Sequence, residues 1–208
     1  MLGFVVGLVA ANAGEWAIHK YVLHGLGRSK RSYWAFHWHE HHRTARRSGG
    51  ADPLYREPLG RARSKRRELL GLLSNALSVA PLWPVSRGFV GAVWLSSGAY
   101  YYVHRRAHLD PAWARRWLPW HYDHHMGPRQ DANWCVTWPL WDWVMGTREP
   151  WAGTDAERRA AGGREGAAGQ AQPAPGDGEA LGGEALERRP LASRTGRALR
   201  SARCGLPE

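Results

Sequence analysis

The chain has 208 residues, enough for one ordinary domain, and its formal net charge of +11 invites a nucleic-acid interpretation. The excess of Lys and Arg falls mainly in two clusters, residues 28–47 and 61–67, which adjoin apolar segments, and no recognised nucleic-acid motif accompanies it. A positive bias on the cytoplasmic side of a membrane accounts for this pattern, so we expect no nucleic-acid partner. The two cysteines, Cys135 and Cys204, lie far apart and do not suggest a disulfide framework.

The first apolar stretch, MLGFVVGLVAANAG, carries no charge before Glu15 and predicts a membrane-spanning helix over about residues 1–18. A helix needs about 20 residues to cross a bilayer, so this span is short or tilted unless it continues past Glu15. A signal peptide fits less well, because no basic region leads the stretch and EWAIHKYVLH follows it directly.

Two further apolar stretches, LLGLLSNALSVAPLWP and GFVGAVWLSSGAYYYV, predict a helical hairpin with spans at about residues 69–84 and 87–103. Pro81 and Pro84 mark the turn of this hairpin. Its tip carries a single charge, Arg87, whereas both of its feet are strongly basic, so we expect the feet on the cytoplasmic side. The alternative is a buried hairpin in a soluble helical bundle, because each arm has only about 16 residues.

Beyond Trp151 the chain is rich in Gly, Ala, Pro and charged residues and lacks aromatic side chains. A segment of this composition cannot bury enough apolar surface to offset the entropy lost on ordering. We therefore expect residues 1–150 to form the folded domain and residues 151–208 to form a disordered tail.

All 11 histidines fall in four short boxes. The boxes are HKYVLH (His19, His24), HWHEHH (His37, His39, His41, His42), HRRAH (His104, His108) and HYDHH (His121, His124, His125). In an α-helix, side chains three or four residues apart share a face, so His104 pairs with His108, His37 pairs with His41, and the last box converges on one spot. Several neutral imidazoles that converge in this way make a transition-metal site.

The expected topology places all four boxes on the same, cytoplasmic, side of the membrane. If the segment of the last box is helical, that box lies about four turns beyond His104 and His108. Ten or so imidazole nitrogens suggest two metal ions, because haem needs only one or two axial ligands and structural zinc usually includes cysteine. We thus predict an all-α integral membrane helical bundle with a cytoplasmic, histidine-rich di-metal cap. Iron suits such a ligand set, and copper or zinc are alternatives.

In this order, the four boxes resemble the eight-to-ten-histidine signature of the membrane fatty acid hydroxylase / sterol desaturase superfamily over roughly residues 12–150. The resemblance implies two non-haem iron ions, O2 as co-substrate, and attack on a C–H bond of a membrane lipid. Its three-residue spacing in the second box selects His37 and leaves His39 as a spare. The implied metal ligands are His19, His24, His37, His41, His42, His104, His108, His121, His124 and His125.

The stretch HYDHHMGPRQDANWCVTWPLWDWVMGTRE resembles the fatty acid and sterol branch, in which an Asn follows the last box and an Asp…Gly-Thr run closes the domain. The matching residues are Asn133, Asp142, Gly146 and Thr147. Carotenoid ring hydroxylases share the histidine arrangement but usually lack this ending. Hydroxylation of a fatty acyl chain is therefore the favoured function, and carotenoid beta-ring hydroxylation is the alternative.

Breaking an unactivated C–H bond requires a redox metal. Carboxylates can orient the ligating rings by accepting their second N–H; Asp123, Glu40 and Asp131 are candidates, and Asn133 is a candidate for holding a metal-bound water. The sequence contains no cytochrome b5-like or ferredoxin domain, so we expect electrons from a separate donor protein of one of these types. A non-catalytic metal- or haem-binding membrane protein is the alternative from another class.

Overall fold

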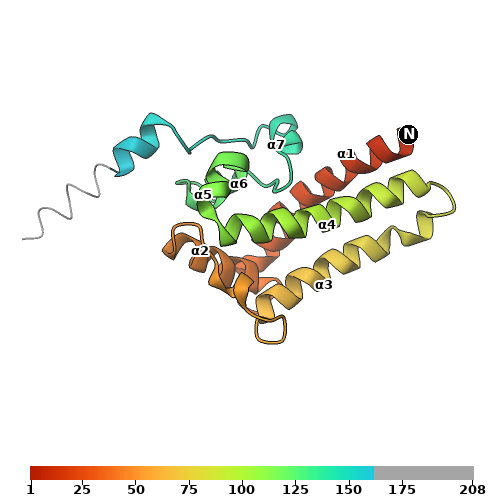
Figure 1. Cartoon of the computed structure of the whole chain (residues 1–208), viewed down its shortest axis with the longest axis horizontal. Helices are drawn as coiled ribbons and strands as arrows, with labels where there is room; N and C mark the ends of the chain where they lie inside the picture. Colours follow the sequence, from red (N-terminus) through yellow and green to blue (C-terminus); the bar gives the residue numbers. More distant parts are fainter. Residues whose placement is uncertain (162–208) are drawn as a thin grey trace, which may run out of the picture. The chain divides into compact units, whose positions relative to one another are not determined.

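The computed structural model describes residues 1–161, and every regular element in this range is a helix, which confirms the all-α expectation there (Figure 1). Residues 162–208, most of the expected tail, lie outside the described residues. The elements are α1 (Leu2–Ala17), η1 (Ile18–Gly25), η2 (Leu26–Arg28), η3 (His37–His42), α2 (Arg43–Arg47), η4 (Pro53–Arg56), α3 (Arg63–Ser78), η5 (Ala80–Leu82), α4 (Arg87–Leu109), α5 (Pro111–Trp117), α6 (Pro119–Met126) and α7 (Leu140–Val144). Two of them, η1 and η3, are π-helices, and η2, η4 and η5 are 3₁₀-helices.

The first apolar stretch continues past Glu15, because α1, η1 and η2 form one helical run from Leu2 to Arg28. This run of 27 residues is the one helix in the described part of the chain that is long and apolar enough to cross a membrane. Neither of the expected spans at 69–84 and 87–103 meets that criterion. Helix α3 has only 16 residues and begins within the basic cluster, and the longer α4 runs on through Arg105 and Arg106.

The second and third apolar stretches form the expected helical hairpin, with α3 and α4 antiparallel and side by side (Figure 1). Ser86 begins α4 by accepting a hydrogen bond from Phe89 N (3.3 Å), which satisfies one of the free N–H groups of the first turn. The indole of Trp94 donates to Ala76 O (2.9 Å) and ties the two arms together.

Helix α1 packs closely along α4, and both helices run in the same direction (Figure 1). A Cβ atom added to Gly7 would stand 2.7 Å from both Ala92 Cβ and Phe89 O, and one added to Gly3 would stand 2.5 Å from Ser86 Oγ. Small residues spaced four apart allow this backbone approach, as they do between transmembrane helices. The packing brings η1, which follows α1 directly and carries His19 and His24, to the same end of the bundle as the histidine-bearing end of α4.

Two proline-marked bends follow α4. Asp110 accepts a hydrogen bond from Trp113 N (3.0 Å) and begins α5 with Pro111 as its first residue, and Pro119 begins α6 in the same position. The last box therefore does not lie four turns beyond His108, as the sequence suggested. The bends return α6 to the end of α4, where His121 Nε2 lies 3.1 Å from His108 Nε2.

The segment after the last box is fastened by Asp142, whose carboxylate accepts Trp134 N and Cys135 N (both 2.8 Å) and Thr147 Oγ1 (2.7 Å). Gly146 adopts the left-handed conformation (φ 64°) that returns the chain to this carboxylate. The Asp…Gly-Thr run thus closes a loop that fastens Trp134 and Cys135, and its Thr147 Oγ1 also accepts a hydrogen bond from Trp16 Nε1 of α1 (2.9 Å).

The folded unit extends beyond the expected boundary at residue 150. Ala152 N donates to Asp123 Oδ1 (2.7 Å), Arg115 pairs with Glu157, and residues 155–161 are helical. The first residues of the segment expected to be a disordered tail are therefore ordered, because polar groups on α5 and α6 bind them.

Candidate metal centre

The fold gathers all ten sequence-predicted ligands at one end of the bundle, and all ten are buried. Nine of them form two groups in which one nitrogen of each ring lies within 4.8 Å of the others. Group A contains His19, His24, His37, His42 and His124, and group B contains His41, His104, His108 and His125. The tenth, His121, stands beside group B through its 3.1 Å approach to His108.

The π-helices explain how the first two boxes supply group A. His19 and His24, and likewise His37 and His42, are five residues apart, which in an α-helix leaves the side chains about 140° from each other. The i→i+5 hydrogen bonding of η1 and η3 widens the turn and places both members of each pair on one face. As a result, His37 Nε2 and His42 Nε2 are 3.2 Å apart. The expected pairing of His37 with His41 is wrong, since these two residues belong to different groups.

The last two boxes use ordinary α-helical spacing. His104 and His108 lie one turn apart with ring centroids at 4.8 Å, and both belong to group B. His121 and His125 have centroids at 4.7 Å, but His124 faces group A. The expectation that all three histidines of the last box converge on one spot is therefore wrong.

Backbone carbonyls hold three of the rings by their outer nitrogen. His19 Nδ1 donates to Trp134 O (2.5 Å), His124 Nδ1 to Ala132 O (2.7 Å) and His108 Nδ1 to Gly50 O (2.8 Å). A carbonyl oxygen can only accept, so each Nδ1 carries the hydrogen and each Nε2 presents a bare lone pair. This is the arrangement in which a metal-ligating imidazole is held by its second N–H.

Two carboxylates that sequence reasoning missed hold rings of group B. His41 Nδ1 contacts Asp52 Oδ2 (2.9 Å), and His104 Nδ1 contacts Glu68 Oε1 (2.5 Å). Burial alone raises the pKa of Glu68, but His104 and the hydrogen bonds from His104 and Tyr55 outweigh it and hold that pKa below its usual range. The signal in the sequence is that Glu68 is the one acidic residue in the basic run SKRRELL, directly beside an apolar segment.

Asn133 and Asp123, the residues proposed from the resemblance to act behind the ligands, have other partners. The side chain of Asn133 accepts Arg148 Nη1 and Glu149 N (both 2.8 Å) and donates to Glu149 O (2.9 Å). Asp123 accepts Ala152 N and pairs with Arg148 Nη2 (2.8 Å). Asn133 fastens residues 148–149 to the segment after the last box, whereas Asp123 fastens Arg148 and Ala152 to α6, and neither side chain holds a histidine ring.

The three remaining candidate residues, Asp131, Glu40 and His39, have different surroundings. Asp131 pairs with Arg28, and its Oδ1 lies 3.7 Å from His24 Nδ1, near group A but beyond hydrogen-bond distance of that ring. Glu40 is exposed to solvent. His39 lies outside both groups, with Nε2 at 2.9 Å from Arg28 O, which agrees with its role as the spare histidine.

The inward nitrogens fit a metal cation. His42 Nε2 lies 3.0 Å from His24 Nε2 and 3.2 Å from His124 Nε2, and neutral rings cannot all place a hydrogen in such a cluster. In group B, His41 Nε2, His104 Nε2 and both ring nitrogens of His125 are buried without a hydrogen-bond partner among the described residues. A cation at the centre of each group satisfies these lone pairs, so both groups can bind metal ions.

The burial of the rings keeps them in the form that ligates metal. Burial, together with neighbouring histidines, lowers the pKa of His42 and of His125 well below the usual value, and burial lowers the pKa of His124 to about 4. These three rings are therefore neutral at physiological pH, as metal coordination requires.

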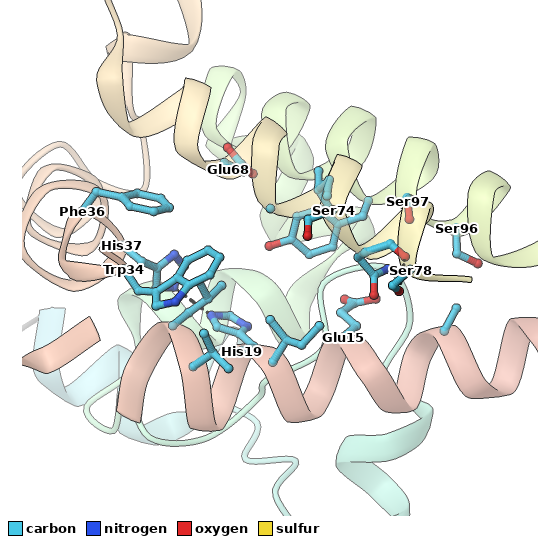
Figure 2. A pocket seen from close by; sticks show the side chains of 18 residues that line it. Glu15, His19, Trp34, Phe36, His37, Glu68, Ser74, Ser78, Ser96 and Ser97 are labelled. Carbon is cyan, nitrogen blue, oxygen red and sulfur yellow. Dashed lines mark hydrogen bonds between the residues drawn. The ribbon is translucent and has the colours of Figure 1, made fainter. Parts of the chain in front are cut away.

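A cavity of about 320 Å³ leads away from group A between α1, α3 and α4 (Figure 2). His19 and His37 line one end of it together with Trp34 (Figure 2). Its walls are mainly apolar, with contributions from Ala11, Ile18, Val22, Leu23 and Leu72. An elongated apolar molecule that enters this cavity therefore reaches the edge of the metal-binding end.

No family model matches the chain, and no curated protein or solved structure matches it either. The geometry itself defines the class: a helical protein with two adjacent, buried, imidazole-lined groups that can bind metal ions, beside an apolar cavity.

Proposed function

We propose that the chain is an integral membrane di-iron hydroxylase that uses O2 to hydroxylate a lipid C–H bond, with a fatty acyl chain as its substrate. One observation carries the proposal: an apolar cavity between the long helices ends at His19 and His37 of an all-imidazole group, with a second such group behind it. The resemblance of the four histidine boxes to the fatty acid hydroxylase / sterol desaturase superfamily supports the same reaction.

The surface of the long helices supports a membrane setting. Large apolar side chains are exposed on each of them, including Val5 on α1, Leu73 and Leu77 on α3, and Leu95 on α4. Apolar surface of this extent is unfavourable in water and favourable in a bilayer. We therefore propose that α3 and α4 accompany α1 through the membrane as a multi-span bundle.

The distribution of charge supports a cytoplasmic site. The basic residues of the hairpin feet lie at the same end of the bundle as the histidines: Arg63, Arg66 and Arg67 at the start of α3, and Arg105 and Arg106 near the end of α4. Loops with this excess of Arg remain on the cytoplasmic side of a membrane. The metal-binding end then faces the cytoplasm, where an acidic electron-donor protein can dock on the same basic surface.

Iron is proposed because amino-acid side chains alone cannot break an unactivated C–H bond. When bound, two iron ions would supply the oxidant. One oxygen atom of O2 would enter the C–H bond and the other would leave as water, with two electrons from a separate donor of the ferredoxin or cytochrome b5 type and two protons from the surrounding water.

The chain's own residues keep the ligands in place and the substrate aligned. Asp52 and Glu68 fix the rings of His41 and His104 with the bare nitrogen inward. The apolar walls beside Leu23 and Leu72 hold the acyl chain and exclude water from the reacting carbon.

Lipid analysis of cells that express the full chain tests the proposal. We expect a lipid that gains the mass of one oxygen atom, iron in the purified protein and no haem absorption band. His124→Ala should abolish the product, whereas His39→Ala, in the histidine outside both groups, should retain it. A Soret band, or an unchanged product with His124→Ala, would exclude the proposed centre. A lipid that loses two hydrogens instead would indicate desaturation, and a hydroxylated carotenoid ring would indicate the alternative substrate.

A further inference from the structure

The polar side chains of the cavity are concentrated away from the metal-binding end. Figure 2 shows Ser78, Ser96 and Ser97 at the opposite end of the view from His19 and His37. Five residues contribute hydroxyl or amide groups to this polar end: Ser74, Asn75 and Ser78 from α3, and Ser96 and Ser97 from α4. Ten residues separate Glu68, which contacts His104, from Ser78, so the cavity extends about 15 Å along α3.

These polar groups retain hydrogen-bonding capacity. Ser78 Oγ donates to Asn75 O (2.7 Å) and Ser97 Oγ donates to Val93 O (3.0 Å), so both oxygens can still accept. The hydroxyls of Ser74 and Ser96 and the amide of Asn75 have no hydrogen-bond partner among the described residues. Asn75 and Ser96 are half-buried and Ser74 is exposed at the mouth of the cavity. In a bilayer, polar groups of this kind need a partner, and a ligand with both a donor and an acceptor provides one.

The ionisable residues of the cavity do not suit a charged ligand. No Lys or Arg lines it, so a carboxylate or phosphate head group would find no cation. Its two acidic residues already have partners: Glu15 accepts Thr137 N (2.8 Å) and Thr137 Oγ1 (2.7 Å), and Glu68 accepts Tyr55 and His104. An amine would therefore have to share a carboxylate that already accepts at least two hydrogen bonds.

We infer that the cavity selects a lipid whose polar group is uncharged, such as an alcohol or an amide, and holds that group among Ser74, Asn75 and Ser96. The apolar chain then extends toward His19, and along α3 Ser74 and Asn75 lie about 10 Å from Glu68 at the metal-binding end. The inference deepens the proposed function and rests on it only for what happens to that carbon.

Binding of four probes of equal chain length tests this selection: dodecan-1-ol, dodecane, dodecanoate and dodecylamine. The radiolabelled probes are titrated against the purified full chain in nanodiscs, and empty nanodiscs correct for partition into lipid. We expect dodecan-1-ol to bind at least about tenfold more tightly than each of the other three, the size of one hydrogen-bonded group left unpaired. Equal or tighter binding of dodecanoate or dodecylamine would overturn the inference.

Substitutions in the cavity test which residues cause the preference for the alcohol. The double variant Asn75→Leu, Ser96→Ala should remove the preference for the alcohol, whereas Leu77→Ala, an exposed residue of α3 outside the cavity, should retain it. Retained preference in the double variant would place the polar group elsewhere and refute the inference. Metal content serves as the folding control, and the single variants Asn75→Ser and Ser96→Ala replace the double variant if that control fails.

The two proposals fail separately, because binding of the probes requires no turnover. Alcohol selectivity without any oxidised lipid would refute the proposed hydroxylation and leave the inference standing. Oxidation of a lipid by a chain that binds all four probes equally tightly would refute the inferred selectivity and leave the proposed hydroxylation standing.

Discussion

His41 and His42 are adjacent in the sequence, yet their imidazoles belong to different groups of histidines. Successive side chains on a helix point in widely different directions around its axis. A pair of adjacent histidines that lies between group A and group B therefore contributes one ring to each group. His124 and His125 divide in the same way, and the rings of His42 and His125 approach with centroids at 4.4 Å. The doublets therefore join the two groups into one centre.

The division of the doublets predicts the metal stoichiometry. The purified chain should bind about two metal ions, and His42→Ala or His125→Ala should each leave about one, because each variant removes a ligand from a different group. Elemental analysis of the purified proteins provides the measurement. His39→Ala is the matched control and should keep both ions; one ion in the unsubstituted chain would contradict the two-group interpretation.

The π-helical geometry of η3 predicts that the five-residue spacing is required. Exchanging His37 and Trp38 (His37→Trp with Trp38→His) keeps the composition but shortens the spacing to His42 to four residues. The moved imidazole should then point away from group A, and the metal of that group should be lost. Metal content with a circular dichroism control measures this, and full metal retention would show that η3 can adopt α-helical spacing without loss.

Asp52 and Glu68 should control metal affinity although neither is a ligand in either group. Asp52→Asn and Glu68→Gln weaken the contacts that orient His41 and His104, and loss of such contacts typically lowers metal affinity about 10- to 100-fold. Competition with a chelator measures the change. Asp123→Asn is the control variant, because the carboxylate of Asp123 holds Ala152 and Arg148 and no histidine ring. An equal loss of metal affinity in Asp123→Asn would contradict a specific role of Asp52 and Glu68 in orienting the rings.

The pKa values predict how the stability of the metal-free chain depends on pH. Burial depresses the pKa of His42, His124 and His125 in the folded state, so below about pH 6.5 the unfolded chain binds more protons than the folded one. The free energy of unfolding should be nearly constant above about pH 7.5 and should fall as the pH drops from 7.5 to 5.5. Denaturant unfolding of chelator-treated protein measures it. A variant with His124→Gln and His125→Gln should show a shallower decrease, and an identical slope would contradict the assignment.

The approach of α1 to α4 predicts a packing defect. Gly7→Val places a side chain where a Cβ already meets Ala92 and Phe89 at 2.7 Å, and overpacking of this kind costs about 1–3 kcal/mol. Gly14→Val is the matched control, since nothing lies within 4 Å of a Cβ there and the cost in helix propensity is the same. Thermal unfolding of the two variants compares them, and equal stability would indicate that α1 and α4 are not in close contact.

Part of the candidate centre was predictable from local sequence. The four histidine boxes and the helical hairpin follow from residue type, spacing and apolar periodicity, which act over a few residues at a time, whereas the choice of His39 as the spare came from the family resemblance. The i,i+4 pairing of His104 with His108 was predictable for the same reason. The pairing within the second box was not, because the π-helical register leaves no mark in α-helical periodicity.

The sequence alone determined which side chains reach the metal-binding end, because the boxes terminate or follow the apolar helices. Only the tertiary structure decided how the imidazoles divide into two groups, since that depends on the bends at Asp110 and Leu118 that return α6 to α4. It also decided which groups hold the rings. Asp52 is 11 residues from His41 and Glu68 is 36 residues from His104, so these pairs meet only when the chain folds and burial makes each polar contact necessary.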